Sequence, residues 1–479
     1  MSRPAAMSGF PEFLPAQRTV ELAVIDALTR TFELHGFASV ETRAVEPLEQ
    51  LLSKGETSKE VYVLRRLQAD RDGDGGSDAG IGLHFDLTVP FARYVVENAG
   101  KLEFPFRRYQ VQKVWRGERP QEGRYREFTQ ADIDIVGRDT LAFHHDVEVA
   151  RVMAEAMAAL PVPRLTLQVN NRRLIQGFYA GLGATDLDAV MRVIDKLDKL
   201  PADAVAKMLV AEAGLTDDQA SLCLQLAEIR TPDTSFVERV RALGVESSLL
   251  DQGLAELAAV VEGCASVSGD RVQVVADLRI ARGLDYYTGT VFETLMEGFE
   301  GLGSICSGGR YDALATDGRA TYPGVGISLG VSRMLVPLLA AGRMTASRSV
   351  PSAVLVALVD EESRDRSDDV ANRLRARGIP TEVAAAPQKF GKQIRTAERR
   401  GIPFVWFPGS TGSGGPGDPG DTEGRADQVK DIRSGDQVDA DPDTWTPPTD
   451  DLRPQVVVST LRQAQDDASS TTRNKEQQQ

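Results

Sequence analysis

With 479 residues, 42% of them hydrophobic and 26% charged, the chain is long enough for two to four domains with buried cores. It contains no run of about 18 apolar residues, and residues 1–10 lack the basic and apolar parts of a secretory signal, so we expect a cytoplasmic protein with no membrane partner. The net charge of −15 argues against a nucleic-acid partner for the chain as a whole, but such binding depends on local basic patches.

Apolar residues recur at helical spacing over residues 15–34, which predicts a helix, and a strand is expected near residues 38–42. Residues 69–80 are rich in Asp and Gly and separate two strand-like runs, 61–67 and 81–87. This pattern predicts a long hairpin loop.

Two further strands are predicted at residues 104–116 and 127–136, joined by a loop that is too long for a tight turn. Together they form an antiparallel hairpin with a polar tip. Because side chains alternate between faces along a strand, one face of the second strand carries polar groups while Ile133 and Ile135 point the other way. That face presents Phe128, Gln130, Asp132 and Asp134.

From residue 171 to about 265 the pattern turns helical, and strands resume at 272–280 and 288–295. We therefore expect a helical insertion at about 171–265 inside an N-terminal domain that covers residues 1–342.

After residue 342 strands and helices alternate, with strands at 353–358 and 404–407 and helices at 368–377 and 389–400. A further strand between the two helices completes a βαβαβ order. This order predicts a separate α/β domain over residues 351–460 with a mostly parallel sheet. Two segments are too polar, or too rich in Gly, Pro and Ser, to pack: a flexible insert at 410–424 and a disordered tail at 463–479.

The three cysteines, Cys223, Cys264 and Cys306, are an odd number at wide spacing. Their spacing fits neither a disulfide framework nor a zinc site. We expect reduced thiols and no metal site formed by protein side chains.

The loop of the predicted hairpin concentrates positive charge. Five basic residues lie in it or beside it: Lys113, Arg116, Arg119, Arg124 and Arg126. Guanidinium groups bind phosphate oxygens in bidentate pairs, so a polyphosphate is the natural ligand. For a lone pair of arginines, a solvated basic hairpin without a ligand would be the better interpretation.

This hairpin, from Val114 to Phe128, resembles motif 2 of class II aminoacyl-tRNA synthetases, with Trp-Arg-Gly-Glu on its first strand and an aromatic residue at the start of its second. Residues 324–333, a glycine-rich strand that leads into Arg333, resemble motif 3. Taken alone, those glycines could equally serve close packing between a helix and a strand. The resemblance implies ATP as a substrate, accompanied by Mg²⁺, and an ATP site made of Arg116, Glu118, Arg124, Phe128 and Arg333. In that site the arginines would hold the phosphates, Phe128 would stack on adenine and Glu118 would contact the adenine side.

Two more segments resemble the histidine-specific boxes of histidyl-tRNA synthetases. They are residues 281–289, Ala-Arg-Gly-Leu-Asp-Tyr-Tyr-Thr-Gly, and residues 307–312, Ser-Gly-Gly-Arg-Tyr-Asp. Such a run of Arg, Gly, Asp and paired Tyr is unusual for an ordinary strand. The chain departs from the family at His84, where members usually have Arg, and at Ser332, where they often have an acid.

The resemblance implies an α+β fold: an antiparallel class II catalytic sheet with flanking helices and a helical insertion, followed by a C-terminal α/β anticodon-binding domain. It implies a homodimer that activates L-histidine with ATP and transfers it to the 3′ end of tRNA(His). Arg282 and Arg116 would be catalytic, facing the reacting phosphate from two sides. The implied histidine-binding residues are Asp86, Leu87, Thr88, Arg116, Gln130, Asp134, Arg282, Tyr286, Tyr287 and Tyr311.

The helix predicted at 389–400 carries a row of basic residues: Lys389, Lys392, Arg395, Arg399 and Arg400. An exposed basic row suits RNA phosphates, although for any single residue a solvated helix face is an equal alternative. The resemblance of the whole domain favours RNA.

Two rival interpretations remain. A regulatory relative could keep the synthetase fold and bind histidine without catalysis, but such proteins tend to lose the box at 281–289 and the C-terminal domain. A synthetase for another amino acid is disfavoured because Asp134, Tyr287 and Tyr311 form an imidazole-type site.

Overall fold

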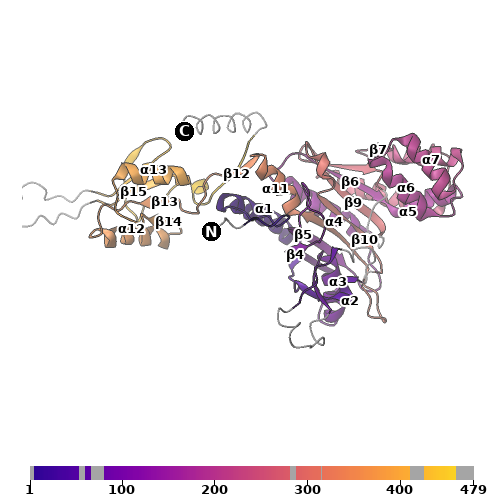
Figure 1. The fold of residues 1–479 in the computed structure, drawn as a ribbon, viewed down its shortest axis with the longest axis horizontal. Coiled ribbons are helices and arrows are strands. Elements are labelled where there is room, and N and C mark those ends of the chain that lie inside the picture. Colours follow the sequence, from indigo (N-terminus) through magenta and orange to yellow (C-terminus); the bar gives the residue numbers. More distant parts are fainter. Residues whose placement is uncertain are drawn as a thin grey trace, which may run out of the picture. The chain divides into compact units, whose positions relative to one another are not determined.

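The computed structural model describes residues 5–52, 60–65, 80–280, 287–313, 315–409 and 426–459, whose fold is drawn in Figure 1. The chain divides into two compact units. The first consists of Met1–Pro11 and Val24–Pro337, and the second of Glu12–Ala23 and Leu338–Gln479. No helix within the described ranges has the length and apolar character needed to cross a membrane.

The first unit is built on a nine-stranded sheet with the order β1-β4-β5-β11-β10-β9-β6-β8-β7. Its strands are β1 (Ala38–Ser39), β4 (Phe106–Trp115), β5 (Glu127–Val136), β6 (Leu165–Asn171), β7 (Arg230–Thr231), β8 (Val272–Asp277), β9 (Tyr287–Met296), β10 (Cys306–Tyr311) and β11 (Gly324–Gly330). Strands β1 and β4 pair in parallel, as do β6 and β8, and the other neighbours are antiparallel. The predicted antiparallel sheet is therefore confirmed.

Strands β4 and β5 form the predicted hairpin, in register from the pair Phe106 and Val136 to the pair Trp115 and Glu127. Helix α4 (His144–Ala158) packs against β5, β8 and β11. The apolar residues of β5 belong to the core, and the side chain of Ile133 has no exposed surface. The polar residues that alternate with them point to the opposite face of the strand, where they can form a site.

The segment before the hairpin combines short strands with helices. Helix α1 spans Pro15–Leu34, as predicted. Strands β2 (Val45–Pro47) and β3 (Ile81–Leu83) pair antiparallel, and the helices α2 (Leu48–Leu52) and α3 (Thr88–Asn98) follow them in the chain. The strand predicted at 61–67 is wrong in length, because residues 60–65 contain a single bridge, from Val63 to Gly82. Most of the predicted loop at 69–80 lies outside the described residues.

A group of helices connects β6 to β8, and Figure 1 shows it at one end of the sheet, beside β7. It contains α5 (Arg172–Gly181), α6 (Leu187–Ile194), α7 (Ala202–Ala213), α8 (Asp217–Ala227), α9 (Phe236–Arg241) and α10 (Ser248–Gly263). Helices α5 and α10 pack closely because each places a glycine at the contact. A Cβ on Gly177 would lie 2.3 Å from the amide nitrogen of Leu250, and a Cβ on Gly253 would lie 2.2 Å from that of Leu174.

The second unit contains a five-stranded sheet with the order β14-β13-β15-β16-β17. Its strands are β13 (Val354–Val356), β14 (Thr381–Val383), β15 (Phe404–Phe407), β16 (Gln428–Asp431) and β17 (Gln437–Asp439), and its helices are α12 (Arg364–Ala376) and α13 (Phe390–Arg400). The first three strands are parallel, as predicted. The last two strands were not predicted and are antiparallel, so the sheet is mixed. A second pair, β12 (Met344–Ala346) with β18 (Val456–Val458), completes the unit.

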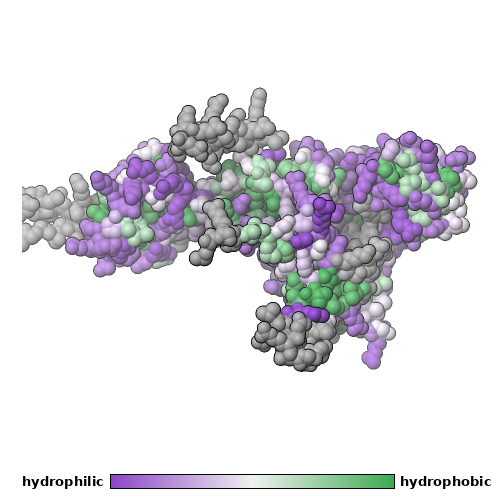
Figure 2. Space-filling view, viewed as in Figure 1, coloured by the Kyte–Doolittle hydropathy of each residue, from purple (hydrophilic) through white to green (hydrophobic). Residues whose placement is uncertain are grey.

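Hydrophobic residues gather at the surface of the first unit over α2 and α3, as Figure 2 shows. Leu52 is 45% exposed there, and Val63, which bridges to β3, is 56% exposed. Beneath them Leu51, Phe85 and Val89 form a buried cluster. An apolar surface of this kind is a candidate for contact with another protein surface.

Candidate functional site

A pocket of about 150 Å³ opens beside the loop that joins β4 to β5. It is lined by Arg116, Glu118, Gly123, Arg124, Tyr125, Phe128, Gln130, Ser304, Ile305, Ser307, Ser328, Gly330 and Arg333. The loop, β5, β10, β11 and the first turn of α11 (Val331–Ala340) all contribute. The five side chains predicted to bind ATP therefore meet at one pocket.

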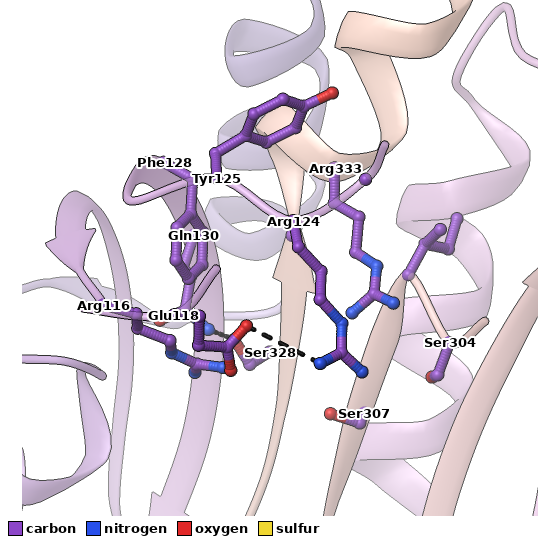
Figure 3. Close-up of a pocket in the computed structure, with 13 residues that line it drawn as sticks. Arg116, Glu118, Arg124, Tyr125, Phe128, Gln130, Ser304, Ser307, Ser328 and Arg333 are labelled. Atoms are coloured by element: carbon purple, nitrogen blue, oxygen red, sulfur yellow. Dashed lines mark hydrogen bonds and ion pairs between the residues drawn. The ribbon is translucent and has the colours of Figure 1, made fainter. Parts of the chain in front are cut away.

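Three arginines line this pocket: Arg116 and Arg124 come from the β4–β5 loop, and Arg333 comes from the first turn of α11 (Figure 3). Burial lowers the pKa of Arg333, and the nearby positive charges of Arg124 and Arg116 lower it further. Glu118 offsets part of this charge, with 3.7 Å between its Oε2 and Nη1 of Arg124. The pocket keeps an excess of positive charge, which suits a polyanion.

One guanidinium nitrogen of Arg333 has a hydrogen-bond partner and another has none among the described residues. Its Nη2 donates a hydrogen bond to the carbonyl oxygen of Leu302. Its Nε is buried and has no hydrogen-bond partner within the described part of the chain. A buried donor without a partner is unfavourable, so this atom is available to a ligand that carries acceptors.

The flat face of Phe128 is the aromatic surface predicted to stack on adenine. In this structure the guanidinium carbon of Arg116 lies 5.1 Å from the centre of the Phe128 ring, which is a cation–π arrangement. Arg116 also donates from Nε to the carbonyl oxygen of Phe85 at 3.0 Å. These two contacts orient the Arg116 side chain before any ligand binds.

Glu60 is a neighbour of the site that sequence reasoning missed. Its carbonyl oxygen accepts a hydrogen bond from the amide of Gly117 at 2.7 Å. Glu60 therefore lies at the base of the β4–β5 loop, called the arginine loop below because it carries Arg116 and Arg124. Burial raises the pKa of its carboxyl group, and the adjacent Glu118 raises it further, while Arg116 and Arg124 oppose the shift. Glu60 lies in none of the segments that resemble known motifs, so no local signal marked it.

Gln130 connects the pocket to a buried polar network between β5 and β11. Its Nε2 donates to Oγ of Ser328 at 2.6 Å, and Ser328 donates to Oδ1 of Asp132. Burial raises the pKa of Asp132 to about 7. Two residues of the polar face predicted for the second hairpin strand, Gln130 and Asp132, are thus joined through Ser328.

Asp134 and Tyr311, both predicted to bind histidine, contact one another directly. The Tyr311 hydroxyl donates to Oδ1 of Asp134 at 2.8 Å, and Nη2 of Arg108 lies 2.7 Å from Oδ2 of the same carboxylate. Burial raises the pKa of the Tyr311 hydroxyl, and the charge of Asp134 adds to that effect. Arg108 was not predicted as a site residue, because it lies two residues after the start of β4 in a run without a recognisable motif.

Two glycines on β11 make room for these side chains. A Cβ on Gly326 would lie 2.0 Å from Oδ1 of Asp134, and a Cβ on Gly324 would lie 2.5 Å from the ring of Tyr311. The alternative interpretation of the motif 3 glycines was close packing between a helix and a strand. It does not describe these two glycines, because the atoms nearest to them belong to the predicted site residues Asp134 and Tyr311.

Three predicted histidine-binding residues, Asp86, Leu87 and Thr88, lie at the start of α3. Oδ1 of Asp86 accepts a hydrogen bond from the amide of Val89 at 3.0 Å, as an N-terminal capping group does. Leu87 is fully buried. The charge of Asp86 reaches Asp132 strongly enough to raise its pKa, so Asp86 lies near the same polar network.

Arg282 and Tyr286, predicted from the box at 281–289, lie outside the described residues. Tyr287 is described and is the first residue of β9, paired with Tyr311 of β10. Its ring covers Gly309, where a Cβ would lie 2.9 Å from Cδ1 of Tyr287. The two tyrosines assigned to the imidazole are therefore neighbours.

His84, the departure from the family pattern, is completely buried. Its ring stacks on Trp115, with 5.5 Å between centres, and its Nε2 lies 2.7 Å from the carbonyl oxygen of Lys113. Burial lowers the pKa of His84, which favours the neutral ring with Nε2 as the donor. The residue thus ties the segment before α3 to β4.

Comparison with known proteins identifies two families along the chain. The model of the histidyl-tRNA synthetase family matches residues 9–334, and the model of the anticodon binding domain matches residues 353–411. The histidine–tRNA ligase of Cutibacterium acnes is 59% identical over 462 residues, which cover 95% of this chain and 99% of the relative. That of Xanthomonas axonopodis pv. citri is 40% identical over 428 residues, which cover 85% and 90%.

Solved structures agree with these matches. The crystal structure of histidyl-tRNA synthetase from Nostoc sp. PCC 7120 is similar with a TM-score of 0.79 and 33% identity, over 92% of this chain and 97% of that one. A structure described as an ATP phosphoribosyltransferase regulatory subunit/histidyl-tRNA synthetase, from Bacillus halodurans C, is similar with a TM-score of 0.66. At 19% identity, that second likeness reflects the fold alone.

Proposed function

This chain belongs to the histidyl-tRNA synthetase family and is an ATP-dependent histidine–tRNA ligase, and on that premise we propose which of its residues perform each part of the reaction. ATP binds in the pocket beside the β4–β5 loop. Histidine binds next to it, along the polar face of β5. The observation that carries this proposal is the meeting of three arginines and the aromatic Phe128 at one pocket that also reaches Gln130.

The ATP site is supported by charge and shape. Arg116, Arg124 and Arg333 supply fixed cations for the phosphates, and Nε of Arg333 is a buried donor that still needs an acceptor. Phe128 supplies an aromatic face for adenine, and Glu118 lies beside it as an acceptor for the adenine amino group. Mg²⁺ enters with ATP, bound to the phosphate oxygens.

The histidine site is supported by the donor and acceptor pattern beside that pocket. Because Tyr311 donates its proton to Asp134, its oxygen keeps lone pairs that can accept an N–H of the imidazole. Gln130, with Asp86 and Thr88, receives the ammonium group, and Tyr287 covers the ring. A pocket of matched polar groups rejects amino acids that would leave those groups unpaired.

Activation is an in-line attack of the histidine carboxylate on the α-phosphorus of ATP, with release of pyrophosphate. The negative charge that develops on the α-phosphate is stabilised by Arg116, which lines the pocket, together with Arg282, the other residue predicted to be catalytic. Positioning and fixed charge supply the catalysis, since the carboxylate is already an ionised nucleophile. A ribose hydroxyl of the 3′-terminal adenosine of tRNA(His) then attacks the carbonyl carbon of the adenylate and forms the histidyl ester. AMP leaves, and its phosphate takes up the hydroxyl proton.

The second unit binds the tRNA, and we place the contact on α13. Lys389, Lys392, Arg395 and Arg399 are exposed along or just before this helix, as an RNA-binding face requires. Arg400 is less available, because its Nη2 donates to Oε2 of Glu382 at 3.0 Å. Contacts to phosphates from this face would position the tRNA without reading its sequence.

We further propose a homodimer that works in the cytoplasm, where tRNA, ATP and ribosomes occur together. The family resemblance supports the dimer, and the exposed apolar residues over α2 and α3 provide a surface that a second copy could cover. Light scattering of the purified protein measures its mass directly. A monomer at micromolar concentration would contradict this part of the proposal.

Amino-acid-dependent ATP–pyrophosphate exchange tests the assignment. Exchange is expected with histidine and with no other of the twenty amino acids. Arg282→Ala is expected to abolish it while the circular dichroism spectrum stays unchanged, and near-normal exchange in that variant would rule out its catalytic role. A regulatory relative of the same fold would bind histidine and show no exchange at all.

A further inference from the structure

The side-chain oxygen of Gln130 is an acceptor without a partner. Gln130 lines the pocket and is only 8% exposed. Its Oε1 is buried and accepts no hydrogen bond from any described residue. Because an unpaired buried acceptor is unfavourable, an atom of this kind in a pocket calls for a donor on the ligand.

The nitrogen of the Gln130 amide is held by Ser328, which is itself held by Asp132. Nε2 of Gln130 donates to Oγ of Ser328 at 2.6 Å, and Ser328 in turn donates to Oδ1 of Asp132. A hydroxyl group has one proton, so once Ser328 gives it to the carboxylate, its oxygen can only accept from Gln130. The amide must then turn its NH₂ group to Ser328 and its oxygen away from it.

The register of β5 and β11 makes this arrangement possible. Asp132 lies directly opposite Ser328, and Gln130 lies opposite Gly330, which has no side chain to compete for the space. Asp132 is 2% exposed, so water does not replace it as the acceptor of the Ser328 proton. The network lies between two neighbouring strands and meets the pocket at Gln130 and Ser328, while Asp132 is not among the lining residues.

We propose that Ser328 and Asp132 are positioning residues that set the orientation of the Gln130 amide, so that Oε1 accepts a hydrogen bond from the α-ammonium group of histidine. This rests on the proposed function, in which Gln130 receives that group. Ser328 and Asp132 act through Gln130 rather than on the substrate itself. An amide turned the other way would direct its NH₂ group at a cation, and the two would repel.

Pyrophosphate exchange by the full-length Ser328→Ala variant tests the proposal. We expect the KM for histidine to rise about tenfold, because a hydrogen bond to a charged group is lost or misdirected. The KM for ATP and kcat should stay within about twofold of the original values. Asp132→Asn should raise the KM for histidine less, because its amide can accept the Ser328 proton but can also donate to Ser328.

Inhibition by 3-(imidazol-4-yl)propionate, which is histidine without its amino group, separates positioning from a general loss of structure. This probe makes no contact through an ammonium group, so its inhibition constant should be unchanged in Ser328→Ala. An equal weakening of histidine and of this analogue would show that the pocket has collapsed and would overturn the proposal.

Ser332→Ala is the matched control. Its hydroxyl oxygen accepts a hydrogen bond from the amide of Thr129 on β5, at 2.9 Å, and does not contact Gln130. This variant removes a hydroxyl that also bonds to β5, but from the first turn of α11 rather than from β11, and its KM for histidine should stay within about twofold of the original value. A rise equal to that of Ser328→Ala would contradict the specific role of Ser328.

The Gln130→Ala variant separates a failure of the proposed histidine site from a failure of the positioning by Ser328. If its KM for histidine is unchanged, Gln130 does not receive the ammonium group, and both the proposed site and its positioning fall. If Gln130→Ala raises this KM and Ser328→Ala does not, the site stands and only the positioning is wrong.

Discussion

Arg108 and Asp134 form an ion pair below the proposed histidine site, with 2.7 Å between Nη2 and Oδ2 and almost no exposed surface on either side chain. No acceptor among the described residues is aligned with an N–H of Nη2, so the pair is held by charge rather than by a directed hydrogen bond. Asp134 also accepts from Tyr311. Asp134 therefore has two partners: Arg108, which balances its buried charge, and Tyr311, which is proposed to recognise the imidazole.

Arg108→Met should be strongly destabilising, because it leaves the carboxylate of Asp134 buried without its counter-charge. Breaking a buried pair in this way costs about 3–5 kcal/mol. The variant should melt at a lower temperature and show a raised KM for histidine in pyrophosphate exchange. Arg107→Met is the control, since Arg107 is 32% exposed and pairs with Glu148 near the surface, where a pair contributes about 1 kcal/mol or less. Equal melting temperatures for the two variants would contradict the role given to Arg108.

Gly326→Ala should displace the Asp134 carboxylate, because the new Cβ would lie 2.0 Å from Oδ1. Overpacking of this kind costs about 1–3 kcal/mol, and the displaced carboxylate should also raise the KM for histidine more than that for ATP. Gly100→Ala is the control, since nothing lies within 4 Å of its Cβ position. A Gly326→Ala enzyme with unchanged histidine kinetics would show that Asp134 does not contribute to binding.

Arg333→Gln should weaken ATP binding selectively. The loss of a charged donor to phosphate is worth about 1.5–3 kcal/mol, or roughly a 10- to 150-fold rise in the KM for ATP. The KM for histidine should change much less. Arg319→Gln, which removes an equal charge from an exposed position, should leave both constants near their original values. A similar effect in both variants would indicate general electrostatics rather than a phosphate contact.

Asp132→Asn should change how stability depends on pH. Burial holds the pKa of Asp132 at about 7, against a usual 3.8. The nearby charges of Asp134 and Asp86 raise this pKa, whereas Arg108 and the hydrogen bond from Ser328 lower it. Cys306 also lies nearby. Because the folded chain keeps this proton more tightly than the unfolded chain, Asp132 lowers stability as pH rises from about 4 to 7, by about 4 kcal/mol at most. The amide of asparagine does not ionise in this pH range, so the variant lacks this loss of stability.

The melting temperature of Asp132→Asn, relative to the original protein, should therefore increase between pH 5 and pH 8. Differential scanning fluorimetry over that range measures the difference. Two parallel curves would mean that Asp132 does not change its protonation over this range in the folded protein.

Much of the fold could be predicted because its signals are local. Helix α1 was predicted with its bounds, and the β4–β5 hairpin to within two residues, since both depend on the spacing of apolar residues along a single segment. Strands β16 and β17 were missed, because Gln428–Asp431 and Gln437–Asp439 are short and polar and are strands through pairing with β15 and with each other. The run at 61–67 was apolar enough to suggest a strand, but its described part makes only one bridge.

The sequence by itself determined the family and named five side chains that meet at one pocket, because motif residues keep their spacing along the chain. Only the tertiary structure decided that Asp134 is paired with Arg108 and contacts Tyr311, that Glu60 adjoins the arginine loop, and that Ser328 holds the amide of Gln130. Ser328 and Gln130 are 198 residues apart in the chain. Their contact depends on which strands pair and in which register, and strand pairing is set by the packing of the whole sheet rather than by any local pattern.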